Sequence, residues 1–145
     1  MIALLQRVNS ANVIVDGDEI ARIGQGLLVL LAVEKNETAA RVERMIERIM
    51  GYRVFEDEQG RMNLSLMDID GDLLMVPQFT LAADTNKGMR PSFTSAAAPD
   101  EGRHWFRYAL DVCQQKSKKV QAGRFGADMK VGLVNDGPVT FWLQV

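Results

Sequence analysis

The run Leu27-Leu28-Val29-Leu30-Leu31-Ala32-Val33 is apolar from end to end and has the length of a β-strand. A strand with one solvated face alternates apolar and polar residues, whereas a strand covered on both faces is apolar throughout. The run therefore predicts an interior strand in a sheet that is covered on both sides.

The segments on either side of this run indicate a hairpin and a helix. On the N-terminal side, Val13–Ile20 places Asp-Gly between two apolar segments, which is typical of a β-hairpin. On the C-terminal side, a helical period begins at Asn36 and ends at Gly51, and either Asn36 or Thr38 can cap its start. The apolar stripe of this helix consists of Val42, Met45, Ile46, Ile49 and Met50.

The second half of the chain repeats this alternation of strands and a helix. We expect short strands at Tyr52–Phe55 and Leu73–Val76, then a long loop from Ala83 to Pro99. A second helix is expected to begin at Pro99 or Asp100, because proline suits a first helical turn. Its apolar face is made of Trp105, Phe106, Ala109, Val112 and Cys113, and a final strand is expected at Met129–Val134.

Length and composition are those of one ordinary globular domain. The chain has 145 residues, of which 47% are hydrophobic and 25% are charged, and no apolar run reaches the roughly 20 residues that span a bilayer. We predict a single mixed α/β domain over residues 1–145, with layered or barrel-like β-sheets and two principal helices packed outside. The N-terminus has no export signal, and a single cysteine suits a reducing compartment, so we expect a cytoplasmic protein.

Charge gives little sign of extended nucleic-acid binding, since the formal net charge is -2. Two basic groups leave room for a local contact, although a solvated surface is the simpler explanation. They are Lys116, Lys118, Lys119, Arg124 and Lys130, and the pair Lys87 and Arg90.

The residues that usually carry hydrolytic chemistry are scarce. His104 is the single histidine and lies on the polar face of the second helix, where a surface role is expected. Cys113 lies on the apolar face and is expected to be a buried, inert thiol. One histidine and one cysteine cannot supply the usual nitrogen and sulfur ligands of a metal, so we predict no metal or cofactor, with an all-carboxylate site left open. An enzyme with this sequence would depend largely on backbone groups and hydroxyls.

Near the C-terminus, Gly137-Pro138 interrupts what otherwise reads as a buried strand, Asn135–Val145. Proline cannot donate to a sheet ladder, so the interruption indicates either a functional site or the end of a sheet edge. Phe79-Thr80 offers a similar choice between a site and a buried strand end.

These two segments, Pro77-Gln78-Phe79-Thr80-Leu81 and Asn135-Asp136-Gly137-Pro138-Val139-Thr140, resemble the two signature motifs of the D-aminoacyl-tRNA deacylase family. The similarity covers essentially the whole chain and includes Met1–Val8, Gly26–Lys35 and the loop Ala82–Phe93. It implies a homodimeric hydrolase that cleaves the ester between a D-amino acid and the 3′-terminal adenosine of tRNA without a metal.

The resemblance also implies roles for particular residues. Gly137 and Pro138 would form a cis dipeptide that one subunit presents to the active site of its partner. The other wall would be formed by Gln78, Phe79 and Thr80, and the adenosine or aminoacyl group would lie near Phe125 and Met129. Pro77 stands where the family usually has serine, so a serine hydroxyl cannot act in this chain.

These residues suggest a filter made of backbone. Rigid carbonyls at Gly137-Pro138 would accept the α-hydrogen of a D-amino acid, collide with an L side chain, and also admit glycine. The amides of Phe79 and Thr80 would stabilise the oxyanion while the ribose 2′-hydroxyl helps to activate water, with Thr80 as nucleophile the alternative. Two other functions stay open: a tRNA-independent hydrolase of small D-amino-acid esters or amides, and a non-enzymatic dimeric binding module.

Overall fold

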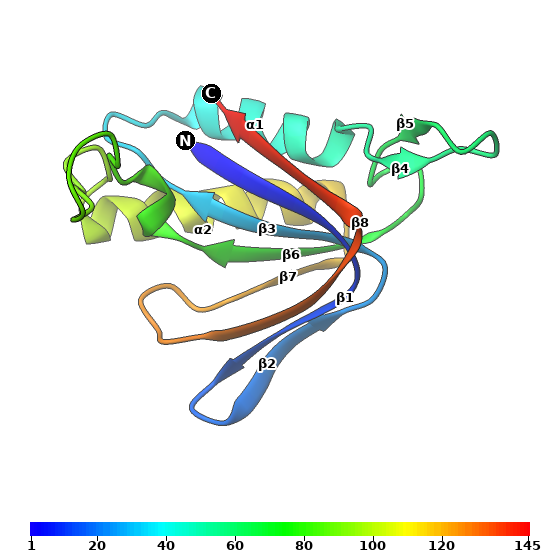
Figure 1. The fold of residues 1–145 in the computed structure, drawn as a ribbon, viewed down its shortest axis with the longest axis horizontal. Coiled ribbons are helices and arrows are strands. Elements are labelled where there is room, and N and C mark those ends of the chain that lie inside the picture. Colours follow the sequence, from blue (N-terminus) through cyan, green and yellow to red (C-terminus); the bar gives the residue numbers. More distant parts are fainter.

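The chain folds into one strongly curved sheet with both long helices against one face, as the computed structural model of residues 1–145 shows (Figure 1). The elements are β1 (Ile2–Val15), β2 (Asp18–Ile23), β3 (Gly26–Ala32), α1 (Ala39–Gly51), β4 (Phe55–Glu56), β5 (Met62–Leu64), β6 (Asp72–Pro77), the 3-10 helix η1 (Phe79–Ala82), α2 (Pro99–Lys116), β7 (Val120–Ala122) and β8 (Lys130–Gln144). The main sheet has the order β2-β1-β3-β6-β7, and β8 pairs with β1. The β3–β6 and β6–β7 pairs are parallel, and β4 and β5 form a small separate sheet.

Strand β3 lies inside the sheet, between β1 and β6, and both of its faces are buried. Leu27, Val29 and Leu31 belong to the core under the helices, whereas Leu28 belongs to a second core on the opposite face. Because successive side chains of a strand point to opposite faces, the continuous apolar run fills both cores. The predicted interior strand is confirmed.

The sheet curls into a nearly closed barrel around the second core. Its outer strands, β2 and β7, meet through a side chain: Gln121 Oε1 accepts from the backbone N–H of Arg22 at 2.9 Å, and Gln121 Nε2 donates to the Arg22 carbonyl. The barrel interior is filled by Val8, Ala11, Val13, Val15, Ala21, Ile23, Leu28, Leu74 and Val76. The predicted barrel-like α/β domain with two principal helices is confirmed.

Both helices begin close to the predicted positions. The first begins at Ala39 rather than at Asn36, because Asn36 has a positive φ of 59° and Thr38 Oγ1 accepts from the N–H of Arg41. Its predicted apolar stripe is buried as expected. In α2, which begins at Pro99, four of the predicted apolar residues are buried and Trp105 is half-buried.

Two predicted strands were wrong in extent. The strand expected at Tyr52–Phe55 is confined to Phe55–Glu56, because the Val54 carbonyl accepts from the Arg7 guanidinium instead of from a neighbouring strand. The strand expected to end at Val134 continues as β8 to Gln144, because β1 pairs with the segments on both sides of the proline. A bulge at Asp136–Val139, opposite Arg7, absorbs the proline.

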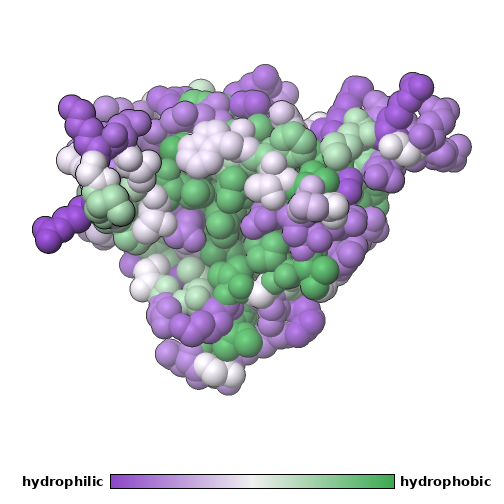
Figure 2. Space-filling model, in the orientation of Figure 1, coloured by the Kyte–Doolittle hydropathy of each residue, from purple (hydrophilic) through white to green (hydrophobic).

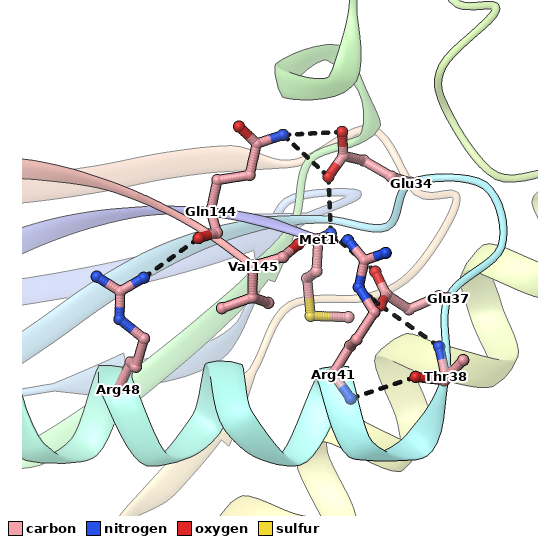
Figure 3. A network of polar contacts seen from close by, with 8 residues as sticks. All are labelled: Met1, Glu34, Glu37, Thr38, Arg41, Arg48, Gln144 and Val145. Carbon is pink, nitrogen blue, oxygen red and sulfur yellow. Dashed lines mark hydrogen bonds and ion pairs between the residues drawn. The ribbon is translucent and has the colours of Figure 1, made fainter.

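Both chain ends are fixed in one polar network beside α1 (Figure 3). The buried ammonium of Met1 forms ion pairs with Glu34 at 2.7 Å and Glu37 at 2.8 Å, and it donates to the Val145 carbonyl at 3.2 Å. Burial raises the pKa of Glu34, but hydrogen bonds from Met1 and Gln144 outweigh it and hold that pKa below its ordinary value. A charge removed from water needs such partners, so the network couples β1 and β8 to the end of β3.

The face that carries β8 has an apolar region at its surface. Figure 2 shows an apolar band there, flanked by polar residues. Leu133, Val134 and Trp142 of β8 are exposed large apolar side chains. Neither helix combines the length and the apolar character needed to cross a membrane.

Candidate functional site

A cavity of about 520 Å³ opens at the carboxyl ends of β3 and β6, where α2 begins. Its lining is mostly apolar: Leu31, Val33, Lys35, Gln78, Phe79, Phe93, Ala96, Ala97, Ala98, Pro99, Gly102, Phe106, Phe125 and Gly126. A larger and more open groove of about 850 Å³ lies between α1 and α2, but it is lined mainly by charged and polar side chains such as Glu43, Glu47 and Lys116. Binding sites for small molecules are concave and mainly apolar with a few polar groups, so the first cavity is the better candidate.

Aromatic rings form the walls of this cavity. Phe79 is 59% exposed, and its ring centroid lies 5.1 Å from that of Phe93. On the α2 side, the Phe125 ring lies so close to the helix that a Cβ on Gly102 would be 3.2 Å from it. Glycine at this position therefore allows Phe125 to pack against the first turns of α2, with Phe106 6.2 Å away between ring centroids.

The turn η1 places backbone donors beside the cavity. The N–H of Gln78 donates to the Leu31 carbonyl at 2.8 Å, which fixes the turn to the end of β3. The first bond within the turn runs from the N–H of Leu81 to the Gln78 carbonyl at 3.2 Å, so the amides of Phe79 and Thr80 have no partner inside it. Thr80 is exposed and does not line the cavity, and its hydroxyl accepts a hydrogen bond from the Gln78 amide.

Pro77 and Met129 meet behind the cavity rather than in its wall. Both approach Gly123, where a Cβ would lie 2.8 Å from Met129 Sδ and 3.4 Å from Pro77 Cδ. Met129 also packs against the core inside the barrel. These two residues support the end of β6 from which η1 continues.

Gly137 and Pro138 lie in the exposed bulge of β8, and the peptide bond between them is cis. Asn135 closes the base of the bulge, because its Oδ1 accepts from the N–H of Val139 at 2.7 Å and its Nδ2 donates to the Val139 carbonyl at 3.1 Å. Gly137 has a φ of +143°, and a Cβ there would lie 2.6 Å from Val139 Cγ2. Only glycine fits this position without strain.

Arg7 holds the bulge from the inside. Its side chain is almost fully buried, with Nε donating to the Asp136 carbonyl at 3.0 Å and Nη1 donating to the Val54 carbonyl at 2.7 Å. The guanidinium also pairs with the Asp136 carboxylate at 3.4 Å. A buried, hydrogen-bonded arginine thus connects the bulge to the segment after α1.

Within one chain, the bulge and the cavity lie at opposite ends of β3. Asn135 pairs with Val8, which pairs with Gly26 at the start of β3, whereas the cavity begins at Leu31. Five residues of strand separate these levels, or about 17 Å. The structure brings Gln78, Phe79 and Phe125 together and sets Pro77 and Met129 behind them, but Gly137 and Pro138 do not reach the same cavity.

The histidine and the cysteine are both outside the site. His104 is exposed on α2 and packs edge-to-face against Trp105, with 4.7 Å between ring centroids. Cys113 is buried, and this burial raises the pKa of its thiol to about 12. The expected surface histidine and inert thiol are confirmed.

Sequence reasoning missed the structural roles of Arg7, Asn135, Phe93 and Gly102. A signal for Arg7 was present, because Ala3 and Leu5 point into the core and strand alternation puts Arg7 on the same face. An arginine at a core-facing position needs buried partners. Nothing local identifies Gly102 or Phe93, since their contacts come from segments far away in the sequence.

Fold and cavity together define a single-domain α/β protein with an aromatic, ligand-sized pocket at the carboxyl ends of parallel strands. A family model described as D-Tyr-tRNA(Tyr) deacylase matches residues 4–144. The chain belongs to this family, which confirms the resemblance seen in the sequence.

Curated relatives and solved structures match this chain along its full length. The chain is 57% identical to a D-aminoacyl-tRNA deacylase of Photorhabdus laumondii subsp. laumondii and 54% identical to one of Escherichia coli O1:K1 / APEC, in both cases over 100% of each chain. A solved structure described as c-Myc DNA Unwinding Element Binding Protein has a TM-score of 0.96 at 37% identity and covers 100% of this chain and 99% of its own. A solved structure described as a probable eukaryotic D-amino acid tRNA deacylase has a TM-score of 0.85 at 17% identity and covers 99% of this chain and 98% of its own. At this low identity the similarity shows the fold alone.

Proposed function

We propose that this protein hydrolyses the ester bond of D-aminoacyl-tRNA and releases the free D-amino acid and tRNA. The observation that carries the proposal is the aromatic cavity of about 520 Å³ beside the free amides of η1, in a chain that belongs to the deacylase family. A volume of this size suits a nucleoside with an attached amino acid. We place the reaction in the cytoplasm, where charged tRNA is used.

The terminal adenosine of the tRNA would enter between the aromatic walls. Base–aromatic stacking tolerates any base and contributes about 1–3 kcal/mol per base. Phe79 is exposed, and Phe125 is fixed by its packing against Gly102, so one ring is free to adapt to the base while the other is rigid. This arrangement would let the terminal adenosine anchor the substrate by stacking.

The amides of Phe79 and Thr80 would stabilise the tetrahedral oxyanion, since preorganised backbone donors act most strongly where charge develops in the transition state. Thr80 is a poor nucleophile here because its hydroxyl accepts a hydrogen bond from the side-chain amide of Gln78, and an amide cannot act as a base to remove the hydroxyl proton. The Gln78 and Thr80 side chains instead orient one another, and the ribose 2′-hydroxyl of the substrate would help to activate water. No cofactor or metal is needed for these steps.

Discrimination between D- and L-amino acids would come from the bulge of a second subunit in a homodimer. Rejecting the L form by a factor of 10⁴ requires about 5.5 kcal/mol, which a clash with a rigid backbone can supply. Support for this arrangement comes from the exposure of Gly137 and Pro138, their fixation by Arg7 and Asn135, and their distance from the cavity of their own chain. The exposed apolar side chains of β8, Leu133, Val134 and Trp142, offer a surface for pairing. Such a filter would also admit glycine, which presents hydrogen in both directions.

Hydrolysis of matched D- and L-aminoacyl-tRNA by the purified protein tests the activity. We expect rapid loss of the D ester, slow loss of the L ester, and inhibition by deacylated tRNA. Indifference to deacylated tRNA would favour a small-molecule hydrolase, and no hydrolysis would favour a binding module. If Thr80→Ala reduced turnover to the uncatalysed rate with unchanged tRNA binding, covalent catalysis by Thr80 would replace the water mechanism.

Mixed dimers test whether the bulge acts across subunits. Gly137→Ala should disable the bulge and Phe79→Ala should weaken binding in the cavity, so each variant alone should be weakly active at substrate concentrations below KM. After the two are unfolded and refolded together, half of the dimers carry one intact site, and about a quarter of the wild-type activity should return. A mixture no more active than the mean of its components would show that the bulge does not serve a partner's cavity.

A further inference from the structure

Arg103 is an unpaired cation at the rim of the cavity. Its guanidinium carbon lies 5.0 Å from the centroid of the Phe125 ring. Its Nη2 lies close to Gly126, at 3.8 Å from the point where a Cβ would stand if this glycine were an alanine. Both of these contacted residues line the cavity. No carboxylate lies within ion-pair distance of Arg103, whereas Arg22, Arg41, Arg44, Lys119 and Lys130 each have one.

Helix geometry does not explain this position. Asp100 lies three residues before Arg103 in the first turn of α2, a spacing at which opposite charges commonly pair on a helix. The guanidinium lies over the Phe125 ring instead, so this ring sets its orientation. Glycine at position 102 allows the ring to lie close to α2, within reach of Arg103. An arginine held by stacking keeps its planar set of donors free and loses less side-chain entropy when it binds an anion.

The substrate provides one phosphate close to this point. In a tRNA that carries an amino acid on its terminal ribose, the last nucleotide has a single phosphate, which joins it to the nucleotide before. An adenosine that stacks on the cavity walls must direct this phosphate out through the rim, because the walls are apolar and a phosphate must keep water or a cation. Arginine binds phosphate oxygens with two parallel hydrogen bonds.

We propose that Arg103 binds the phosphate that joins the terminal adenosine of the tRNA to the preceding nucleotide. This rests on the proposed function, because it places the adenosine in the same cavity. Arg103 is here a binding residue for tRNA and takes no part in bond cleavage. It gives the enzyme affinity for a tRNA end over a free aminoacyl nucleoside.

The test compares two substrates: D-aminoacyl-tRNA, and 3′-O-(D-aminoacyl)adenosine, which has no phosphate. Arg103→Gln should raise KM for the tRNA substrate about 10-fold with kcat little changed, and should leave hydrolysis of the adenosine ester unaffected. The slope of log binding constant for deacylated tRNA against log salt concentration should become shallower by about 0.7, the value for one contact to a single strand. Arg103→Lys, which keeps the charge, should restore most of this slope.

The matched control is Arg61→Gln, which removes the same charge from the exposed turn between β4 and β5 and should change neither KM nor the salt slope. Equal damage to both substrates would mean that Arg103 only supports Phe125, and an unchanged KM would mean that it binds no phosphate; each result overturns the proposal. If the wild-type protein hydrolyses neither substrate, the proposed function fails, and the tRNA-binding slopes of the variants still decide whether Arg103 contacts phosphate.

Discussion

The cavity and the Gly137-Pro138 bulge are built in opposite ways. The cavity has a buried floor that includes Leu31 and Phe106, but its outer rings, Phe79 and Phe93, are exposed, and Phe79 has more than half of its surface in solvent. The bulge is exposed at its tip, but buried hydrogen bonds from Arg7 and the short bonds of Asn135 fix its base. Under the proposed function this difference fits two roles: exposed rings would stack on the terminal adenosine of the tRNA, and a rigid backbone would reject one mirror image of the amino acid.

This contrast predicts different responses to mutation. Changes at the bulge should cost stability or discrimination, because its contacts are buried and directional. Changes at the exposed rings of the cavity, Phe79 and Phe93, should cost binding and leave the fold intact.

Removing the buried guanidinium of Arg7 should have the largest effect on stability. Arg7→Met leaves the carbonyls of Val54 and Asp136 without their donors, so we expect the free energy of unfolding to fall by about 3 kcal/mol in urea titrations. Arg22→Met is the control, because its pair with Glu19 is exposed to solvent and should contribute little to stability. Arg7→Lys should recover little, since one ammonium cannot reproduce the two directed bonds. Equal losses for Arg7 and Arg22 would contradict a special role for the bulge.

A methyl group at Gly137 should act on activity more than on stability. Its Cβ would meet the backbone nitrogen of Val139 at 2.8 Å and force an unfavourable φ, so the bulge must move. We expect kcat/KM for D-aminoacyl-tRNA to fall about 100-fold, because displaced backbone costs the pre-aligned geometry. Gly60→Ala is the control: it has a φ of +74° but nothing within 4 Å, and should lose about 1 kcal/mol of stability with normal activity. Normal activity in Gly137→Ala would remove the bulge from the site.

The two regions also differ in how far the sequence revealed them. The interior strand at Leu27–Val33 and the helical stripe of α1 follow from periodicity, which is a local property. The bulge was recognised as an interruption, but its position opposite Arg7 depends on the register of β1 with β8, across more than a hundred residues of chain. The cavity likewise depends on Phe93 and Gly102, whose contacts are made only in the folded chain.

Truncation of the exposed ring should weaken substrate binding alone. Phe79→Ala removes one stacking face, so KM for D-aminoacyl-tRNA should rise about 10-fold, within the range of base–aromatic stacking. The melting temperature should stay near that of the wild type, because the side chain is 59% exposed. Met89→Ala, at a fully exposed side chain in the neighbouring loop, should change neither quantity. A large loss of stability with unchanged KM would show that Phe79 is structural and would erase the contrast with Arg7.

Loss of the Glu34 charge should have the smallest effect on stability, and the effect should depend on pH. Glu34 follows β3 and bridges to Ala96 in the cavity wall, and its pKa is held below the ordinary 4.5. A carboxylate whose pKa is lower in the folded state stabilises the fold at pH values above the unfolded pKa and loses this contribution as pH falls through the folded pKa. Glu34→Gln should therefore lower the melting temperature by about 2 °C at pH 7, and the difference from the wild type should vanish well below pH 4. A difference that persists in acid would show that Glu34 acts through packing rather than through its charge beside Met1.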